Sequence, residues 1–330
     1  MSKFVCLLLR SNFQVFPSFL IAGLGMVFAG LLLDEVQHWE VFQGVSQLFI
    51  IVPPLLGLKG NLEMTLAARL STAANLGKFD KKSSALSLVS GNLLLIQCQG
   101  IVIGFLAAAV GLFLGWDFES ELDLDIILLV CTIAVVTASL ASLILSLTMI
   151  SVIILTRKMS CNPDNIATPI AASLGDVTTL CLLAWTANFL YKEMLAESSI
   201  AWVTISIYVF TLPLLFYLTA NNPHSSEILL RGWTPIILAM LISSGGGYIL
   251  DKSLHRFKGI SLFLPVINGA GGNLVAIHVR IIIQSLEIEN IGIKQHIKQT
   301  NLWPLLTNLN TLNHSSLDIQ NDHLSSLCYT

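Results

Sequence analysis

The stretch IILLVCTIAVVTASLASLILSLTMISVIILT, residues 126–156, contains no charged side chain. It is long enough to cross a lipid bilayer as a helix, which takes about 20 predominantly apolar residues. Comparable apolar stretches occur at about 12–33, 44–66, 84–114, 166–191, 200–220, 229–250 and 259–284. Together they predict an all-α polytopic membrane protein with about eight transmembrane helices, because a membrane β-barrel shows short alternating strands instead.

The composition agrees with this fold class. The chain is 54% hydrophobic and 11% charged, whereas a soluble domain carries about 25% charged residues. The stretch 12–33 is too long for the core of a signal peptide and lacks a clean cleavage site, so we interpret it as the first span. The six cysteines are scattered without the spacing of a zinc site or a disulfide framework. We therefore expect no cofactor and no sizeable soluble domain.

The charged loops predict the orientation in the membrane. Loops 34–40 and 117–125 are acidic and hold no Lys or Arg, whereas the loops on the other side carry most of the basic residues. By the positive-inside rule this arrangement predicts a cytoplasmic N-terminus. Residues 251–258, with three basic side chains on the outer side, run against it.

An internal repeat organises the chain. PPLLGLKGNL (53–62) and PVINGAGGNL (265–274) share the pattern P-x-x-x-G-x-x-G-N-L, and the spans before them lead into Asp34 and Asp251. We expect two parallel repeats, a known transporter geometry. The predicted segments are a cytoplasmic N-terminal segment 1–11, a first five-helix unit 12–192, a linker 193–228 with the sixth span, an incomplete second unit 229–284 and a polar, disordered tail 285–330.

The repeated motif predicts a broken helix that lines a polar path. Backbone groups freed by proline and glycine at membrane depth must be satisfied by protein or by a water-filled cavity. The freed carbonyls, with the amides of Asn61 and Asn273, are oxygen ligands suited to a hard cation. The alternative is that the glycines only allow helices to pack closely.

Asp176 interrupts the apolar stretch 166–191. A charged Asp at a helix centre costs about 2.5–3.5 kcal/mol on insertion scales, so such residues usually mark an ion or proton path. Thr168, Ala172 and Asp176 are spaced four apart and share one helix face. They offer a cation a hydroxyl, a backbone carbonyl and a carboxylate. The alternative is a protonated Asp176 that hydrogen-bonds a neighbouring helix.

Two further carboxylates are weaker candidates for cation ligands. Asp164 follows Asn162 and Pro163, a pairing typical of a helix cap with proline at the first helical position, so a favourable first-turn charge explains it equally well. Glu63 lies two residues after Asn61, near the predicted cytoplasmic end of span two. It either draws cations toward the mouth of the path or is a solvated interfacial residue.

These motifs resemble the membrane domain of the MgtE magnesium transporters and, more closely, their eukaryotic relatives, the solute carrier family 41 proteins. The resemblance covers about residues 12–279 and is carried by residues 53–77, 162–180 and 267–277. It implies two MgtE-like units joined by an extra helix, transport of Mg²⁺, and Na⁺ as a counter-ion. It also implies a central ion site at Asp176, Ala172 and Thr168, with the motif asparagines at Asn61 and Asn273.

The resemblance further implies a multi-pass protein of the plasma membrane. The second unit stops before its own fifth helix, as in a truncated or alternatively spliced form. We therefore expect an active chain to associate with a second copy or with a full-length paralogue. The alternative function is a non-conducting partner that regulates a full-length magnesium transporter.

Two other function classes are not expected. SLGD (173–176) resembles the GxGD motif of intramembrane aspartyl proteases, but Ser173 replaces the first glycine and no second motif aspartate is present. A carboxyl dyad for acid–base catalysis is therefore missing, and we expect no enzyme. We expect no nucleic-acid partner either, because no basic patch adjoins aromatic residues.

Overall fold

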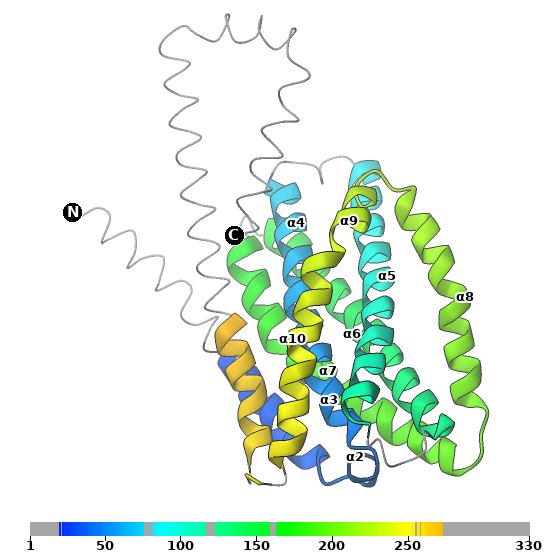
Figure 1. Ribbon diagram of the computed structural model, residues 1–330. Coiled ribbons are helices and arrows are strands. Elements are labelled where there is room, and N and C mark those ends of the chain that lie inside the picture. The colour runs from blue at the N-terminus through cyan, green and yellow to red at the C-terminus, as the bar shows by residue number, and fades with distance from the viewer. Residues whose placement is uncertain are drawn as a thin grey trace, which may run out of the picture. The chain divides into compact units, whose positions relative to one another are not determined.

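The computed structural model describes residues 20, 22–75, 79, 82–116, 123–158, 163–254, 256–257 and 259–272, which lie in one compact unit, Met1–Gly272 (Figure 1). Within these ranges the ordered elements are helices, and no strand occurs. The predicted all-α membrane fold is confirmed. The predicted segment 1–11, Asn273 and the predicted tail 285–330 lie outside the described residues.

The described helices overlap the predicted spans, and the predicted count of about eight transmembrane helices stays a prediction. They are a first helix over 22–36, α2 (Glu40–Gly44), α3 (Gln47–Leu58), the π-helical segment η1 (Lys59–Glu63), α4 (Met64–Asn75), α5 (Lys82–Leu114), α6 (Leu124–Lys158), α7 (Pro163–Leu195), α8 (Ile200–Ala220), α9 (Ser226–Arg231), α10 (Trp233–Leu254) and a helix over Ile260–Gly272. Among the described residues, the segments Ser83–Leu114, Leu124–Thr156, Ile200–Ala220 and Trp233–Leu254 are long and apolar enough to cross a membrane.

The predicted break in the second span is a π-helical turn instead. The chain remains helical from α3 through η1 into α4, although Pro53 and Pro54 lie inside α3. A π turn takes up one extra residue without leaving the helical path, and such turns are frequent at functional sites. The interruption of the predicted broken helix is therefore confined to the hydrogen-bonding pattern of residues 59–63, and the chain stays helical through it.

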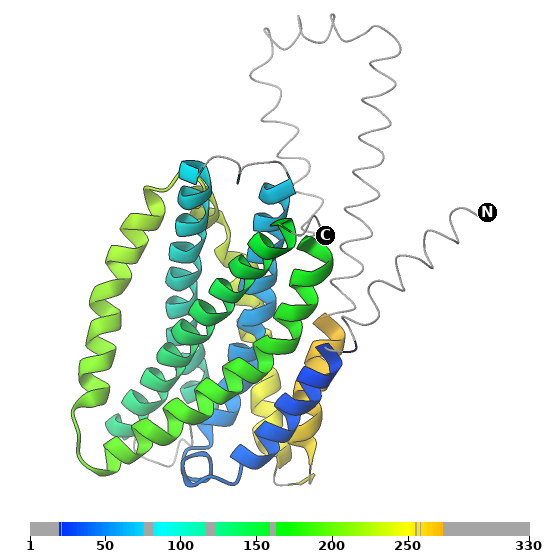
Figure 2. The same ribbon diagram turned by 180° about the vertical axis from the view of Figure 1, so that it is seen from behind.

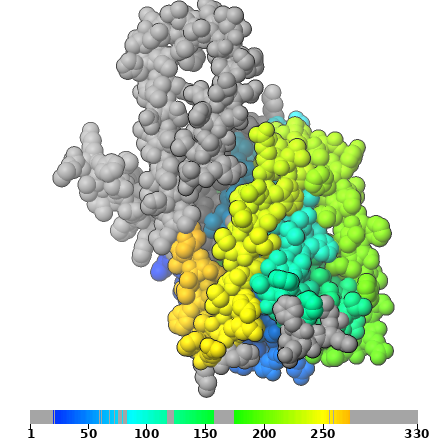
Figure 3. Space-filling model, viewed as in Figure 1, coloured from blue at the N-terminus to red at the C-terminus, as the bar shows by residue number. Residues whose placement is uncertain are grey.

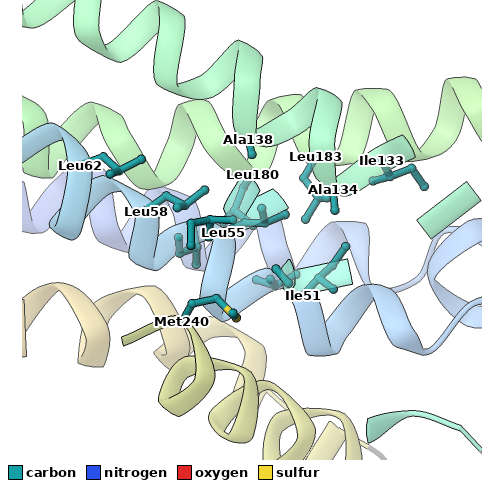
Figure 4. Close-up of a cluster of buried hydrophobic side chains, with 14 of the residues drawn as sticks. Ile51, Leu55, Leu58, Leu62, Ile133, Ala134, Ala138, Leu180, Leu183 and Met240 are labelled. Atoms are coloured by element: carbon teal, nitrogen blue, oxygen red, sulfur yellow. The ribbon is translucent and has the colours of Figure 1, made fainter. Parts of the chain in front are cut away.

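Helix α3 lies at the centre of the packed helices. It contacts α5, α6, α7 and α10, and η1 contacts α6, α7 and α10 as well. Figure 4 shows how its apolar side chains meet those of the surrounding helices. The labelled residues are Ile51, Leu55, Leu58, Leu62, Ile133, Ala134, Ala138, Leu180, Leu183 and Met240. The first copy of the repeated motif is thus surrounded by protein and not by lipid.

Two glycines allow equivalent close approaches between helices. A Cβ atom on Gly30, in the first helix, would collide with the backbone carbonyl of Leu262, and one on Gly247, in α10, would collide with that of Ile50. Pro54 has no N–H to donate to the Ile50 carbonyl, so this carbonyl is free to face Gly247. Gly30 and Gly247 are separated by the same number of positions as Asp34 and Asp251. The two glycines therefore occupy equivalent positions in the two copies of the repeat.

A second pair of contacts also joins equivalent positions in the two copies of the repeat. A Cβ on Gly57 would lie 3.4 Å from the hydroxyl oxygen of Ser243, and one on Gly269 would collide with the side chain of Met26. Gly57 and Gly269 are equivalent positions of the repeated motif. The first helix of each copy therefore packs against the motif helix of the other copy. Figures 1 and 2 show helix 22–36 (blue) beside helix 260–272 (orange) from both sides.

The outer surface of the helices is strongly apolar. Figure 3 shows α10 (yellow) beside the helix 260–272 (orange) on one face. Helix α8 packs against α5 and α6, yet none of the residues in its apolar segment is buried. An unburied apolar helix of this length is suited to contact with lipid.

Candidate cation site

Helix α7 holds the carboxylate that interrupts the apolar sequence. It begins at Pro163, as predicted, and runs without a break to Leu195. Positions 168, 172 and 176 therefore fall on one face of the helix. Asp176 is 2% exposed, so its side chain does not face lipid. The side chains of Asp164, Thr168 and Ala172 lie outside the described residues.

The surroundings of Asp176 are helical and protein-lined. Helix α7 packs against α4, α6 and η1. Thr179, close to the same stripe, is 3% exposed and donates a hydrogen bond of 2.8 Å to the carbonyl of Gly175 in its own helix. A buried carboxylate is stable only when a cation, a proton or hydrogen-bond donors offset its desolvation. The placement is therefore compatible with an ion ligand and with a protonated group.

Glu63 is buried at the end of the π-helical segment. Its side chain is 1% exposed, and the hydroxyl of Ser146 on α6 donates a hydrogen bond of 3.0 Å to its Oε2 atom. The Ser142 hydroxyl, one turn earlier on α6, also interacts with this carboxylate. The interpretation of Glu63 as a solvated interfacial residue was wrong, because η1 is enclosed by α6, α7 and α10.

Unsatisfied polar atoms gather in and after the π-helical segment. Buried atoms without a hydrogen-bond partner include Oε1 of Glu63, Nη1 of Arg69 and Oγ of Ser71. The Nε atom of Arg69 donates to the Thr65 carbonyl at 3.3 Å. Since buried polar groups are normally paired with protein or ordered water, the segment 63–71 has the polarity of a hydrated or ion-bearing region.

The structure brings only some of the predicted ligands together. The backbone of Asn61 lies in η1, which contacts the helix of Asp176, whereas the Asn61 side chain and the whole of Asn273 lie outside the described residues. In the described part of the chain, no three His, Cys, Asp or Glu side chains group closely enough to hold a metal ion. Of the predicted acidic ligands, the structure describes the side chains of Asp176 and Glu63. Asp176 lies on α7 and Glu63 on η1, and these two elements contact each other.

Sequence reasoning missed Ser146 as the partner of Glu63. The two residues are 83 positions apart, so no local pattern links them. A signal was nevertheless present, because Ser139, Ser142 and Ser146 recur at helical spacing along one face of α6. The described structure buries all three hydroxyl-bearing residues. A serine stripe inside an apolar span marks the side of the helix that faces polar groups.

The sequence of this region is similar to that of known proteins. Residues 52–186, which include α3, η1 and Asp176, match the family model MgtE, described as a divalent cation transporter. The chain is 46% identical over 295 residues to mouse solute carrier family 41 member 3, covering 89% of this chain and 60% of that protein. It is 47% identical over 280 residues to human solute carrier family 41 member 2, covering 84% and 49% respectively.

The chain thus spans about half to three fifths of the length of these relatives. No solved structure matches it. The matched family is one of transporters and not of enzymes. The resemblance predicted from the sequence motifs is confirmed: residues 52–186 match the MgtE family model, and most of the chain is similar to the solute carrier family 41 proteins.

Proposed function

We propose that this chain forms the ion path of a magnesium transporter. The observation that carries the proposal is the burial of Asp176, which is 2% exposed within a helix of the region matched by a divalent cation transporter family. A carboxylate inside an apolar helix is costly unless it serves an ion or proton path. Helix α7 also contacts η1, the π-helical segment of the repeated motif.

The proposed ligand set is rich in oxygen and low in charge. It consists of the Asp176 carboxylate, the Ala172 carbonyl, the Thr168 hydroxyl and the amides of Asn61 and Asn273, with Asp164 and Glu63 as further acidic residues of the path. Mg²⁺ keeps several of its waters and is bound through one or two carboxylates. A single aspartate with neutral oxygen donors therefore suits a hydrated Mg²⁺ better than a closed cage of carboxylates.

The proposed path lies between two repeated units. The predicted boundaries are 12–192 for the first unit, 193–228 for the linker and 229–284 for the second unit. Support comes from the two sets of glycine contacts, which join the helices of the two motif copies at equivalent positions. The remaining proposals are coupling to Na⁺, a plasma-membrane location, a cytoplasmic N-terminus and association with a second copy or a longer paralogue.

Uptake of Mg²⁺ by cells expressing the chain tests this function. Asp176→Asn keeps the size of the side chain and removes its charge, so we expect transport to be lost while the amount of protein in the membrane stays normal. The matched control is Asp125→Asn, because Asp125 is an exposed aspartate in the first turn of α6. Unchanged uptake in Asp176→Asn contradicts the site. Reduced uptake on co-expression with a full-length transporter favours a regulatory partner instead.

A further inference from the structure

One buried carboxylate is only half satisfied. Glu63 is 1% exposed, its Oε2 atom accepts a hydrogen bond from Ser146, and its Oε1 atom has no hydrogen-bond partner. A buried charged group with an empty acceptor costs free energy unless a positive charge or a donor offsets it. The vacant acceptor on this buried side chain is therefore an atom to which a cation or a proton can bind.

The described basic residues do not supply that charge. Arg69 is the one basic residue of α4, and its Nε atom is directed to the Thr65 carbonyl while its Nη1 atom has no partner. Lys192 of α7 and Lys252 of α10 lie in the last turns of their helices. Neither the Arg69 guanidinium nor these two ammonium groups hydrogen-bonds Oε1 of Glu63.

We propose that Glu63, Ser146 and the backbone carbonyls of the π-helical segment bind one sodium ion. The proposal rests on the proposed function, because it assigns the counter-ion of the transported Mg²⁺ a site separate from Asp176. A single carboxylate balances a single positive charge, and backbone carbonyls of irregular helical segments coordinate Na⁺ in other transporters.

The π-helical turn explains how a helix can offer carbonyl ligands. In an α-helix each interior carbonyl accepts a bond from the residue four positions on. Across residues 59–63 the pattern changes to five positions, which removes the usual partner from a carbonyl at the transition. In the proposed site, a backbone carbonyl at this transition, the Oε1 atom of Glu63 and the Ser146 hydroxyl would provide three oxygen ligands from two helices.

The site is placed to communicate with Asp176. Segment η1 contacts α7 directly, so an ion that orders η1 also acts on the helix that carries Asp176. If bound Na⁺ changes the binding free energy of Mg²⁺, then bound Mg²⁺ must change the binding free energy of Na⁺ by the same amount. Occupation by Na⁺ and occupation by Mg²⁺ are therefore expected to depend on each other.

Thermal unfolding of the purified full chain in detergent tests the sodium site. The Tm is followed as NaCl replaces choline chloride at constant ionic strength. We expect the Tm of the wild type to rise with Na⁺, and Glu63→Gln to raise the half-maximal Na⁺ concentration at least about tenfold. Ser146→Ala is expected to raise it by a smaller factor. Ser151→Ala is the matched control, because this exposed hydroxyl on α6 bonds only the Leu147 carbonyl of its own helix, at 2.8 Å.

A parallel titration with MgCl₂ separates this proposal from the proposed function. Asp176→Asn should lose the Mg²⁺-dependent rise in Tm and keep the rise with Na⁺, whereas Glu63→Gln should show the opposite. Absence of any Mg²⁺ response in the wild type contradicts the proposed function and leaves the sodium result intact.

The sodium proposal is overturned if the wild type does not respond to Na⁺ or if Glu63→Gln responds normally. In the first case, Lys59→Met shows whether Lys59 supplies the charge instead, since its loss would then lower the Tm. If Glu63→Gln does not fold, an unchanged Na⁺ response in Ser146→Ala overturns the proposal equally.

Discussion

Helices α6 and α8 are similar as sequences and opposite in their surroundings. Both are apolar enough to cross a membrane, yet more than half of the apolar segment of α6 is buried and none of that of α8 is. Helix α6 buries a set of hydroxyl side chains, Thr132, Thr137, Ser139, Ser142, Ser146 and Thr156, whereas α8 buries Thr219 at its end. Hydropathy therefore identifies a span without showing whether lipid or protein surrounds it.

Small residues account for the difference. Helix α5 crosses α6 where Gly104 lies close to Val135 and Ala134, and a Cβ on Gly104 would be only 3.0 Å from the Cα of Val135. Small side chains let two helices approach closely and replace lipid contacts by dispersion contacts. Helix α8 presents bulky residues outward instead, including Trp202 and Phe210, which are 56% and 79% exposed. What an apolar helix packs against depends on its small residues and not on its hydropathy.

The same substitution on the two helices should show the largest contrast. Ile133 of α6 is fully buried, whereas Ile207 of α8 is 58% exposed. We expect Ile133→Ala to lower the free energy of unfolding by about 2–5 kcal/mol, because it leaves a cavity in a packed core. Ile207→Ala should change it by less than about 0.5 kcal/mol. Equilibrium unfolding in mixed micelles measures both, and equal losses would show that α8 is packed against protein.

Added bulk at the α5–α6 crossing should have a smaller effect. Gly104→Leu places a side chain against the backbone of α6, and overpacking of this kind costs about 1–3 kcal/mol. Ala109→Leu adds a larger side chain to an exposed position of the same helix and is expected to be neutral. Tm values of the two variants check the difference. A neutral Gly104→Leu would mean that α5 and α6 separate easily.

The smallest expected effect concerns a polar contact between α6 and α7. The hydroxyls of Thr137 and Thr186 lie 2.9 Å apart and share a buried hydrogen bond. Hydrogen bonds between membrane helices contribute about 0.6 kcal/mol on average, so Thr137→Val should lower stability by about 0.5–1 kcal/mol. Thr148→Val is the control, because its hydroxyl bonds the Ile144 carbonyl of the same helix. A double mutant with Thr186→Val isolates the coupling, and a coupling of zero contradicts the assignment.

Sequence patterns predicted where the helices lie better than they predicted the hydrogen-bond pattern inside them. The start of α7 at Pro163 and the continuous span 200–220 were predicted because proline placement and apolar length are local properties. The π-helical turn at 59–63 was not predicted, since proline and glycine lower helical stability without specifying which hydrogen-bond pattern replaces the ladder. The role of Asp176 as an ion ligand remains a prediction, and its burial agrees with that role.

The burial of Glu63 illustrates the same limit within the candidate site. Its position near the end of a predicted span suggested solvent, but α4 continues the helix to Asn75 and places Glu63 well inside it. Whether a carboxylate at such a position is exposed depends on the neighbours of the helix. Here those neighbours are α6, α7 and α10.

The amino-acid sequence alone determined the membrane fold class, the repeated motif and the presence of Asp176 in an otherwise apolar segment. These properties follow from the free energy of transferring each segment into lipid and from local backbone chemistry. Only the tertiary structure decided that Ser146 meets Glu63 and that Gly247 meets the Ile50 carbonyl. Such contacts join segments that are far apart in the chain, and they depend on how whole helices fit together.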